Sequence, residues 1–136
     1  MKTDLLIDEL KSFLGDRFST SESVRSNYAK GEDAFDPVLS YGVAFPNNNE
    51  EVSKIVRICN NHSIPIIPFG SGTSLEGNAV GNSEGITLSL QNMNKIISIN
   101  ENDFDCRVES YVTRKQLNEY LKEKGLFFPI DPGAEA

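Results

Sequence analysis

Residues 41–77 read YGVAFPNNNEEVSKIVRICNNHSIPIIPFGSGTSLEG, and this stretch decides the fold. The apolar run Tyr41–Pro46 predicts a short strand, because the proline and the asparagines after it favour a turn. Asn48 and Glu51 are three positions apart, as in a capping box at the start of a helix. Apolar residues then recur with helical spacing at Val52, Ile55, Val56 and Cys59. We therefore expect a strand followed by an amphipathic helix that ends near Asn60.

A second strand is predicted at Ile64–Phe69, where the sequence IPIIPF is mostly apolar and β-branched. Its two prolines cannot donate backbone hydrogen bonds, so this strand should be short or lie at the edge of a sheet. Strand, helix and strand at this spacing form a βαβ unit, with parallel strands and a right-handed crossover. The expected fold class is α+β, with a small parallel sheet and covering helices.

The segment before residue 41 predicts one helix and a long connection. Thr3 is a suitable N-cap, apolar residues recur with helical spacing up to Leu14, and Gly15 is a suitable helix end. Residues 16–40 are rich in Ser, Asn and Asp and show no regular period. We therefore divide the chain into residues 1–40, a helix with a connecting segment, and residues 41–136, the main domain.

Three further strands are predicted downstream, at Ile86–Leu90, Lys95–Ile99 and Cys106–Val112. The last two are expected to form a hairpin across the polar connection between them. Thr113 and Gln116 form a second capping box, which predicts a final helix, and Gly125 is its expected end.

Composition and charge exclude some classes of function. The chain has 136 residues, of which 38% are hydrophobic, and a formal net charge of -7. This acidic balance argues against general nucleic-acid binding, which needs a basic surface. No apolar run reaches the roughly 18 residues of a membrane span. The N-terminal segment carries acids within its apolar stretch, unlike a signal or transit peptide, so a cytoplasmic location is expected.

Cysteine and histidine are scarce. Cys59 lies on the apolar stripe of the predicted helix and is expected to be a buried thiol, and Cys106 has no partner at metal-ligand spacing. His62 is the only histidine and is expected at the surface or near the helix end. One histidine cannot form a metal site by itself. We therefore expect no metal site and no Ser-His-Asp triad.

The segment Gly70–Gly77, here called the glycine loop, carries the strongest chemical signal. Gly70 and Gly72 lack a Cβ atom, so their backbone can take positive φ and direct several N–H groups toward one point. Three hydroxyl side chains are interleaved with them: Ser71, Thr73 and Ser74. Such a nest at the end of a buried strand suits the oxygens of a phosphate or pyrophosphate. The alternative is a solvent-exposed glycine turn without a ligand.

Two common phosphate-binding loops do not match this segment. A Walker A loop needs lysine and a hydroxyl residue where Asn78 and Ala79 stand. A dinucleotide-binding Rossmann loop needs a third glycine where Leu75 stands, with a helix directly after the loop. The sequence therefore predicts phosphate binding by a different scheme.

Four motifs together resemble one family. The segment PFGSGTSLEG after the predicted helix and strand, VESYVT with QLN after it, and FPIDPGA at residues 128–134 occur in the order expected of FAD-linked oxidases related to vanillyl-alcohol oxidase. The resemblance is closest to the branch that contains FAD-dependent D-lactate dehydrogenase, the glycolate oxidase flavoprotein subunit and D-2-hydroxyglutarate dehydrogenase.

The resemblance implies a set of cofactor-binding residues. In this family the glycine loop wraps the pyrophosphate of FAD, and a later Asp-Pro-Gly turn lies against the flavin. The implied positions are Pro68, Gly70, Ser71, Gly72, Thr73, Ser74, Gly77, Asp131, Pro132 and Gly133. The last three also fit an ordinary reversal turn, which stays open as an alternative.

The resemblance also implies an activity. The expected protein is a flavoprotein oxidoreductase that oxidises a small D-2-hydroxy acid such as D-lactate or glycolate, passes electrons to a quinone or cytochrome, and associates peripherally with the inner face of the membrane. The chain is expected to be the first subdomain of a two-part FAD-binding domain plus the start of the second, and an inactive fragment without catalytic residues of its own. A non-catalytic nucleotide- or partner-binding module, or another substrate class of the same superfamily, stays open.

Overall fold

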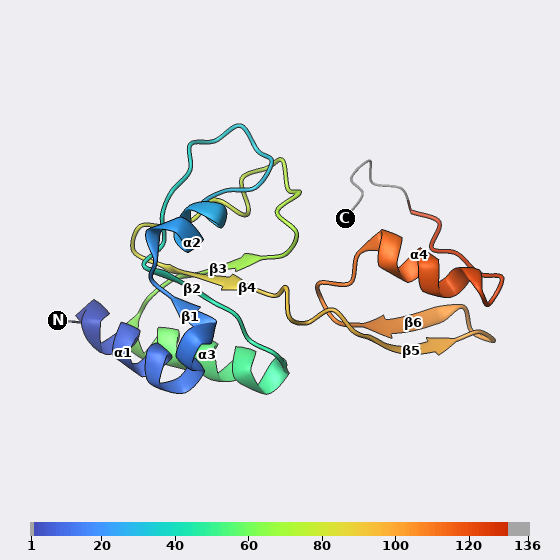
Figure 1. Cartoon of the computed structure of the whole chain (residues 1–136), viewed down its shortest axis with the longest axis horizontal. Coiled ribbons are helices and arrows are strands. Elements are labelled where there is room, and N and C mark those ends of the chain that lie inside the picture. The colour runs from blue at the N-terminus through green and yellow to red at the C-terminus, as the bar shows by residue number, and fades with distance from the viewer. Residues whose placement is uncertain (1, 131–136) are drawn as a thin grey trace. The chain divides into compact units, whose positions relative to one another are not determined.

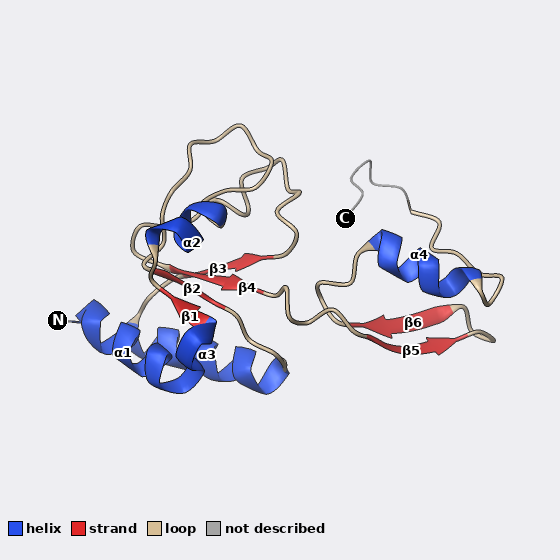
Figure 2. Cartoon of the chain, viewed as in Figure 1, coloured by secondary structure: helices blue, strands red, loops and turns tan. Residues whose placement is uncertain are grey.

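The computed structural model describes residues 2–130. The chain divides into two compact units, residues 1–92 and residues 93–136, and each is described by itself (Figure 1). Helices and strands occur together in both units, so the α+β class expected from the sequence is confirmed (Figure 2). The division at residue 40 stays a prediction.

The first unit is built on a four-stranded sheet with the order β1-β2-β4-β3. The strands are β1 (Phe18–Ser19), β2 (Gly42–Ala44), β3 (Ile66–Phe69) and β4 (Ile86–Ser89). β2 and β3 both pair in parallel with β4, and β1 pairs antiparallel with β2. The two strands of the predicted βαβ unit are therefore parallel but not adjacent, because β4 lies between them. β3 lies at the sheet edge, as its prolines predicted.

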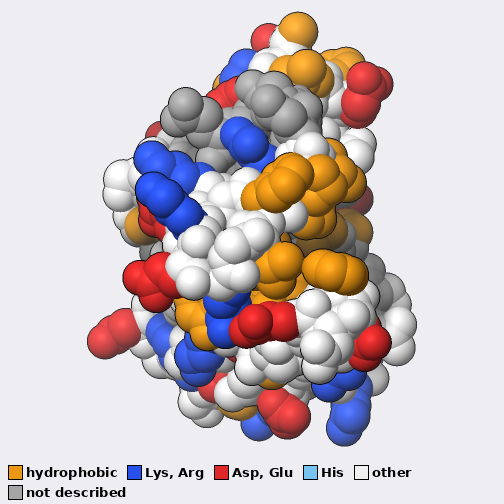
Figure 3. All heavy atoms as spheres, turned by 90° about the vertical axis from the view of Figure 1, so that its right-hand side faces the viewer, with side chains coloured by type: hydrophobic (Ala, Val, Ile, Leu, Met, Phe, Trp, Pro, Cys, Tyr) orange, Lys and Arg blue, Asp and Glu red, His pale blue; other side chains and the backbone are white. Residues whose placement is uncertain are grey.

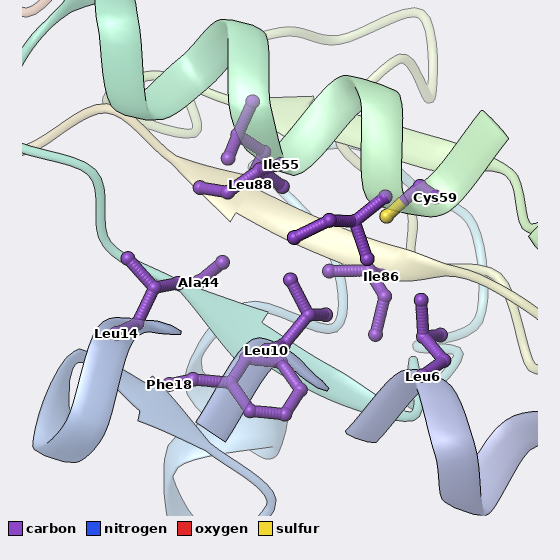
Figure 4. Close-up of a cluster of buried hydrophobic side chains, with 10 residues drawn as sticks. Leu6, Leu10, Leu14, Phe18, Ala44, Ile55, Cys59, Ile86 and Leu88 are labelled. Atoms are coloured by element: carbon purple, nitrogen blue, oxygen red, sulfur yellow. The ribbon is translucent and has the colours of Figure 1, made fainter. Parts of the chain in front are cut away.

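Helices α1 (Lys2–Leu14) and α3 (Asn49–His62) cover one face of this sheet, and the short α2 (Glu22–Asn27) lies on the other side (Figure 2). The core lies between the sheet and the two long helices (Figure 4). Its buried members are Leu6, Leu10, Leu14, Phe18, Ala44, Ile55, Ile58, Cys59, Ile86 and Leu88. Val56, which the sequence placed on the buried stripe of α3, is 44% exposed, and Ile58 is buried instead.

The sequence signals for the start of α3 and for the end of α1 are confirmed, and the signal for the start of α1 is not. The side-chain Oδ1 of Asn48 accepts a hydrogen bond from the Glu51 N–H at 2.9 Å, which confirms the first capping box. Gly15 has φ of +57° and terminates α1, as expected. Thr3 is wrong as the N-cap, because α1 already includes Lys2.

The segment predicted to lack regular structure contains three short elements. A 3-10 turn at Gly15–Arg17 leads into β1, and α2 follows. The Arg17 guanidinium joins the turn to the start of α3, because its Nη2 donates to Glu51 Oε1 at 2.9 Å. Elements of two to six residues are too short to show a hydrophobic period, which explains why the sequence did not predict them.

The second unit consists of a hairpin and a helix. β5 (Ile96–Asn100) pairs antiparallel with β6 (Asp105–Val108), which confirms the predicted hairpin. α4 (Arg114–Lys122) begins after Thr113, whose Oγ1 accepts a hydrogen bond from the Gln116 N–H at 3.1 Å. Large hydrophobic side chains are exposed at the surface of this unit, as the space-filling view also shows (Figure 3). None of the described helices is long and apolar enough to span a membrane.

Candidate functional site

A pocket of about 210 Å³ opens at the glycine loop, directly after the C-terminal end of β3. It is lined by Pro68, Gly70, Ser71, Gly72, Thr73, Ser74, Asn78 and Ala79. The carboxyl end of a strand in a parallel sheet is a common place for a ligand. The structure therefore brings together all the sequence-predicted residues of this region except Gly77. Asn78 and Ala79 were missed, because the sequence offered them only as mismatches to a Walker A loop.

Gly72 requires glycine for two reasons. Its φ is +76°, a conformation that side chains with a Cβ atom rarely adopt. A Cβ atom built there would also lie 2.9 Å from Cζ of Phe69. The positive φ expected at Gly72 is confirmed, and the Phe69 ring beneath it adds a packing requirement.

Gly70 differs from Gly72. It is not among the described residues with positive φ, so that expectation was wrong for this glycine, which continues directly from β3. A Cβ atom built at Gly70 would meet no protein atom within 4 Å. The missing side chain at Gly70 therefore leaves space at the pocket open to a ligand.

Gly77 has a packing role outside the pocket lining. Its φ is +78°, and a Cβ atom built there would lie 2.7 Å from Cε2 of Phe35. The Phe35 ring thus packs on the backbone of the glycine loop, although the residue is 56% exposed. Gly77 therefore fixes the end of the loop instead of lining its pocket.

The glycine loop carries hydrogen-bond donors that suit an anion. Within the described part of the chain, the backbone N–H groups of Ser71 to Ser74 have no acceptor. The hydroxyls of Ser71 and Thr73 are 3.4 Å apart, a long separation that leaves both able to bind a further group. Uncharged donors converging on a concave backbone are the arrangement that binds phosphate oxygens without lysine. The residues present therefore fit a pyrophosphate group.

The other residues singled out by the sequence lie elsewhere. Cys59 is buried in the core, and burial, followed by the nearby Glu9 carboxylate, raises the pKa of its thiol to about 11. His62 Nε2 lies 3.0 Å from Glu9 Oε2, so this histidine joins α3 to α1. Cys106 is exposed. Within residues 2–130, no three His, Cys, Asp or Glu side chains lie together in a way that could hold a metal ion.

Asp131, Pro132 and Gly133 lie outside the described residues. Their predicted position against the flavin stays a prediction.

A comparison with known families gives the pocket its context. The model of a family described as the FAD binding domain matches residues 41–136, which include the whole pocket. The chain belongs to the FAD-binding domain family. The resemblance found in the sequence motifs is therefore confirmed, and FAD is the cofactor of this family.

Relatives with assigned names extend this result. The chain is 40% identical over 132 residues to "Probable D-lactate dehydrogenase, mitochondrial" of Danio rerio, and the match covers 96% of this chain and 27% of the relative. It is 38% identical over 133 residues to "D-lactate dehydrogenase [cytochrome], mitochondrial" of Arabidopsis thaliana, covering 96% and 24%. The chain thus spans about a quarter of the length of these relatives.

Among solved structures, 4-ethylphenol oxidase from Gulosibacter chungangensis is similar to the FAD-binding domain described here. The two share 28% sequence identity with a TM-score of 0.82, and the match covers 96% of this chain and 26% of the oxidase. The similarity supports the fold.

Proposed function

We propose that this chain holds FAD in an oxidoreductase that converts a small D-2-hydroxy acid, D-lactate in the first place, to the 2-oxo acid. In that reaction the α-carbon loses a hydride and the hydroxyl loses a proton. FAD, when bound, would accept the two electrons of the hydride. A quinone or a cytochrome then takes up the electrons. Glycolate is the second substrate to test, and the cytoplasmic location stays a prediction.

The pocket at the glycine loop is the observation that carries this proposal. Its backbone N–H groups and the hydroxyls of Ser71, Thr73 and Ser74 would hold the pyrophosphate oxygens of FAD. The open space over Gly70 would let the phosphates approach the backbone closely. We assign these residues to cofactor binding alone and no acid or base of this chain to catalysis. The names of the two D-lactate dehydrogenases support the substrate class.

Gly70→Ala tests the pocket, in the protein at its full natural length. The added methyl group meets no protein atom within 4 Å, so folding should be unaffected. The same methyl group would occupy the open space through which a phosphate would approach, so the dissociation constant for FAD should rise by about tenfold, the effect of losing one charge-assisted hydrogen bond. Binding is measured by titration of apo-protein with FAD, and folding by thermal unfolding. If the Gly70→Ala variant binds FAD with unchanged affinity, the glycine loop is an ordinary turn that does not bind the cofactor.

The substrate class is tested on the FAD-loaded protein. Anaerobic addition of D-lactate should remove the absorbance of oxidised flavin, and L-lactate serves as the matched control. If glycolate reduces the flavin and D-lactate does not, the proposed substrate becomes glycolate and the rest of the proposal stands. Retention of flavin that no hydroxy acid reduces would favour a non-catalytic nucleotide-binding module.

A further inference from the structure

A segment far from the glycine loop in sequence lies against it in space. We call residues 29–38 the bracing segment. The Glu32 N–H donates a hydrogen bond to the carbonyl oxygen of Gly72 at 2.8 Å, and the Gly81 N–H donates to the carbonyl oxygen of Ala29 at 2.8 Å. The Phe35 ring packs on Gly77. The bracing segment therefore contacts the glycine loop at its centre, at its end and just beyond it.

The central contact leaves no spare space. A Cβ atom built at Gly31 would lie 2.5 Å from the carbonyl oxygen of Gly72 and 3.2 Å from that of Ser74. Both of these loop carbonyls therefore face the backbone of the bracing segment. Because carbonyl and N–H groups of consecutive residues are linked by rigid peptide planes, holding the carbonyls restricts where the neighbouring N–H groups can point.

Asp33 fixes the shape of the bracing segment from within. Its side chain is buried, and each carboxylate oxygen accepts one backbone hydrogen bond: Oδ2 from the Gly31 N–H at 3.1 Å and Oδ1 from the Phe35 N–H at 3.0 Å. The Lys30 ammonium donates to the carbonyl oxygens of Asp33 and Phe35 at 3.2 and 3.1 Å. A buried carboxylate is costly unless it is hydrogen-bonded, so this turn is held tightly around Asp33.

We propose that Asp33 is a positioning residue for FAD: it sets the bracing segment, which holds the glycine loop in the conformation that binds the pyrophosphate. This inference rests on the proposed function of the glycine loop. Asp33 acts through Gly31 and Phe35, whose N–H groups donate hydrogen bonds to its carboxylate. Gly31 in turn contacts Gly72, and the Phe35 ring contacts Gly77. If only a fraction of the molecules have the loop in its binding conformation, the apparent affinity for the ligand is reduced in proportion to that fraction.

The test is Asp33→Asn in the full-length protein, titrated with FAD as apo-protein. Asparagine keeps the size of the side chain but offers one acceptor oxygen in place of two, so one of the two N–H groups is left without its partner. We expect the dissociation constant for FAD to rise about fivefold, the effect of one lost hydrogen bond, at full binding stoichiometry. Asp36→Asn is the matched control, because Asp36 is exposed three positions away. It should leave FAD binding unchanged.

The binding stoichiometry separates positioning from a general structural role. If Asp33→Asn only unfolds part of the protein, a smaller fraction of molecules binds FAD and the dissociation constant of the folded remainder is unchanged. This result would overturn the inference. An unchanged titration, or an equal effect of Asp36→Asn, would overturn it as well. Gly31→Ala is the second variant, which pushes directly on the Gly72 carbonyl and should raise the dissociation constant even if Asp33→Asn fails to fold.

Gly70→Ala, measured in the same series, separates this inference from the proposed function. If Gly70→Ala weakens FAD binding and Asp33→Asn and Gly31→Ala do not, only the positioning role fails. If none of the three variants affects FAD, the assignment of the glycine loop fails as a whole.

Discussion

At the scale of single residues, the three glycines of the glycine loop differ in what they require. Gly72 has positive φ and packs closely on the Phe69 ring. Gly77 also has positive φ and packs on the Phe35 ring. Gly70 has no protein atom near the place of its missing side chain. The sequence predicted that glycines cluster here for a ligand. It could not separate these roles, because two of them depend on aromatic rings whose positions are set by tertiary structure.

Gly72→Val should abolish or greatly weaken FAD retention in the full-length protein. A β-branched residue at φ of +76° is strained, typically by about 1–3 kcal/mol, and its side chain would meet the Phe69 ring. Bound flavin after gel filtration measures retention, and far-UV circular dichroism reports the fold. Thr73→Val is the milder control, since it removes one hydroxyl and keeps the shape. A full complement of FAD in Gly72→Val would contradict the assignment.

The two cysteines should differ sharply in reactivity. Burial raises the pKa of Cys59 to about 11, so its thiol carries almost no thiolate near neutral pH, whereas Cys106 is exposed. We expect iodoacetamide to modify Cys106 in the native chain, and Cys59 only after denaturation. Mass spectrometry of labelled peptides measures both sites. Equal labelling of the native protein would show that the core around Cys59 opens readily.

At the scale of elements, the sequence predicted those with strong local signals. The capping residues Asn48 and Thr113 and the apolar strands are read directly from residue type and spacing. β1 and α2 were missed, because β1 has two residues and depends on pairing with β2 for its conformation. The insertion of β4 between β2 and β3 was also missed, since strand order is a property of the sheet and not of any one segment.

The junction of the 3-10 turn with α3 should make stability depend on pH. The hydrogen bonds and charge of Arg17 lower the pKa of the Glu51 carboxyl below its ordinary value of 4.5. A carboxyl with a lowered pKa in the folded state stabilises the protein above its unfolded pKa, and this contribution is lost as the pH falls through the folded value. Glu51→Gln should therefore lower the thermal midpoint more at pH 7 than in strong acid.

Thermal unfolding across this pH range measures the effect, with Glu50→Gln as the control. Glu50 is the exposed neighbour of Glu51 on the first turn of α3. A Glu51→Gln deficit that is the same at all pH values would mean that the carboxylate charge contributes nothing.

At the scale of the whole molecule, we expect the 136-residue chain to fold but to retain FAD weakly, with no dehydrogenase turnover. The pocket at the glycine loop measures about 210 Å³, below the roughly 300–1,000 Å³ typical of sites that enclose a ligand. It can hold one part of a dinucleotide and leaves the rest without contacts from the glycine loop. Flavin absorbance of the purified chain tests this. Tight stoichiometric flavin, or reduction by D-lactate, would contradict it.

The order of strands in the sheet has a consequence for how this chain acquires its structure during synthesis. β2 and β3 emerge from the ribosome before β4, yet the parallel ladder has no hydrogen bonds until β4 lies between them. The core that α3 packs into is therefore complete only when Ile86 and Leu88 of β4 join Ile55 and Cys59. We therefore expect the parallel sheet of the first unit to form only after residues 86–89 have been synthesised, because both of its parallel pairings are made by that strand.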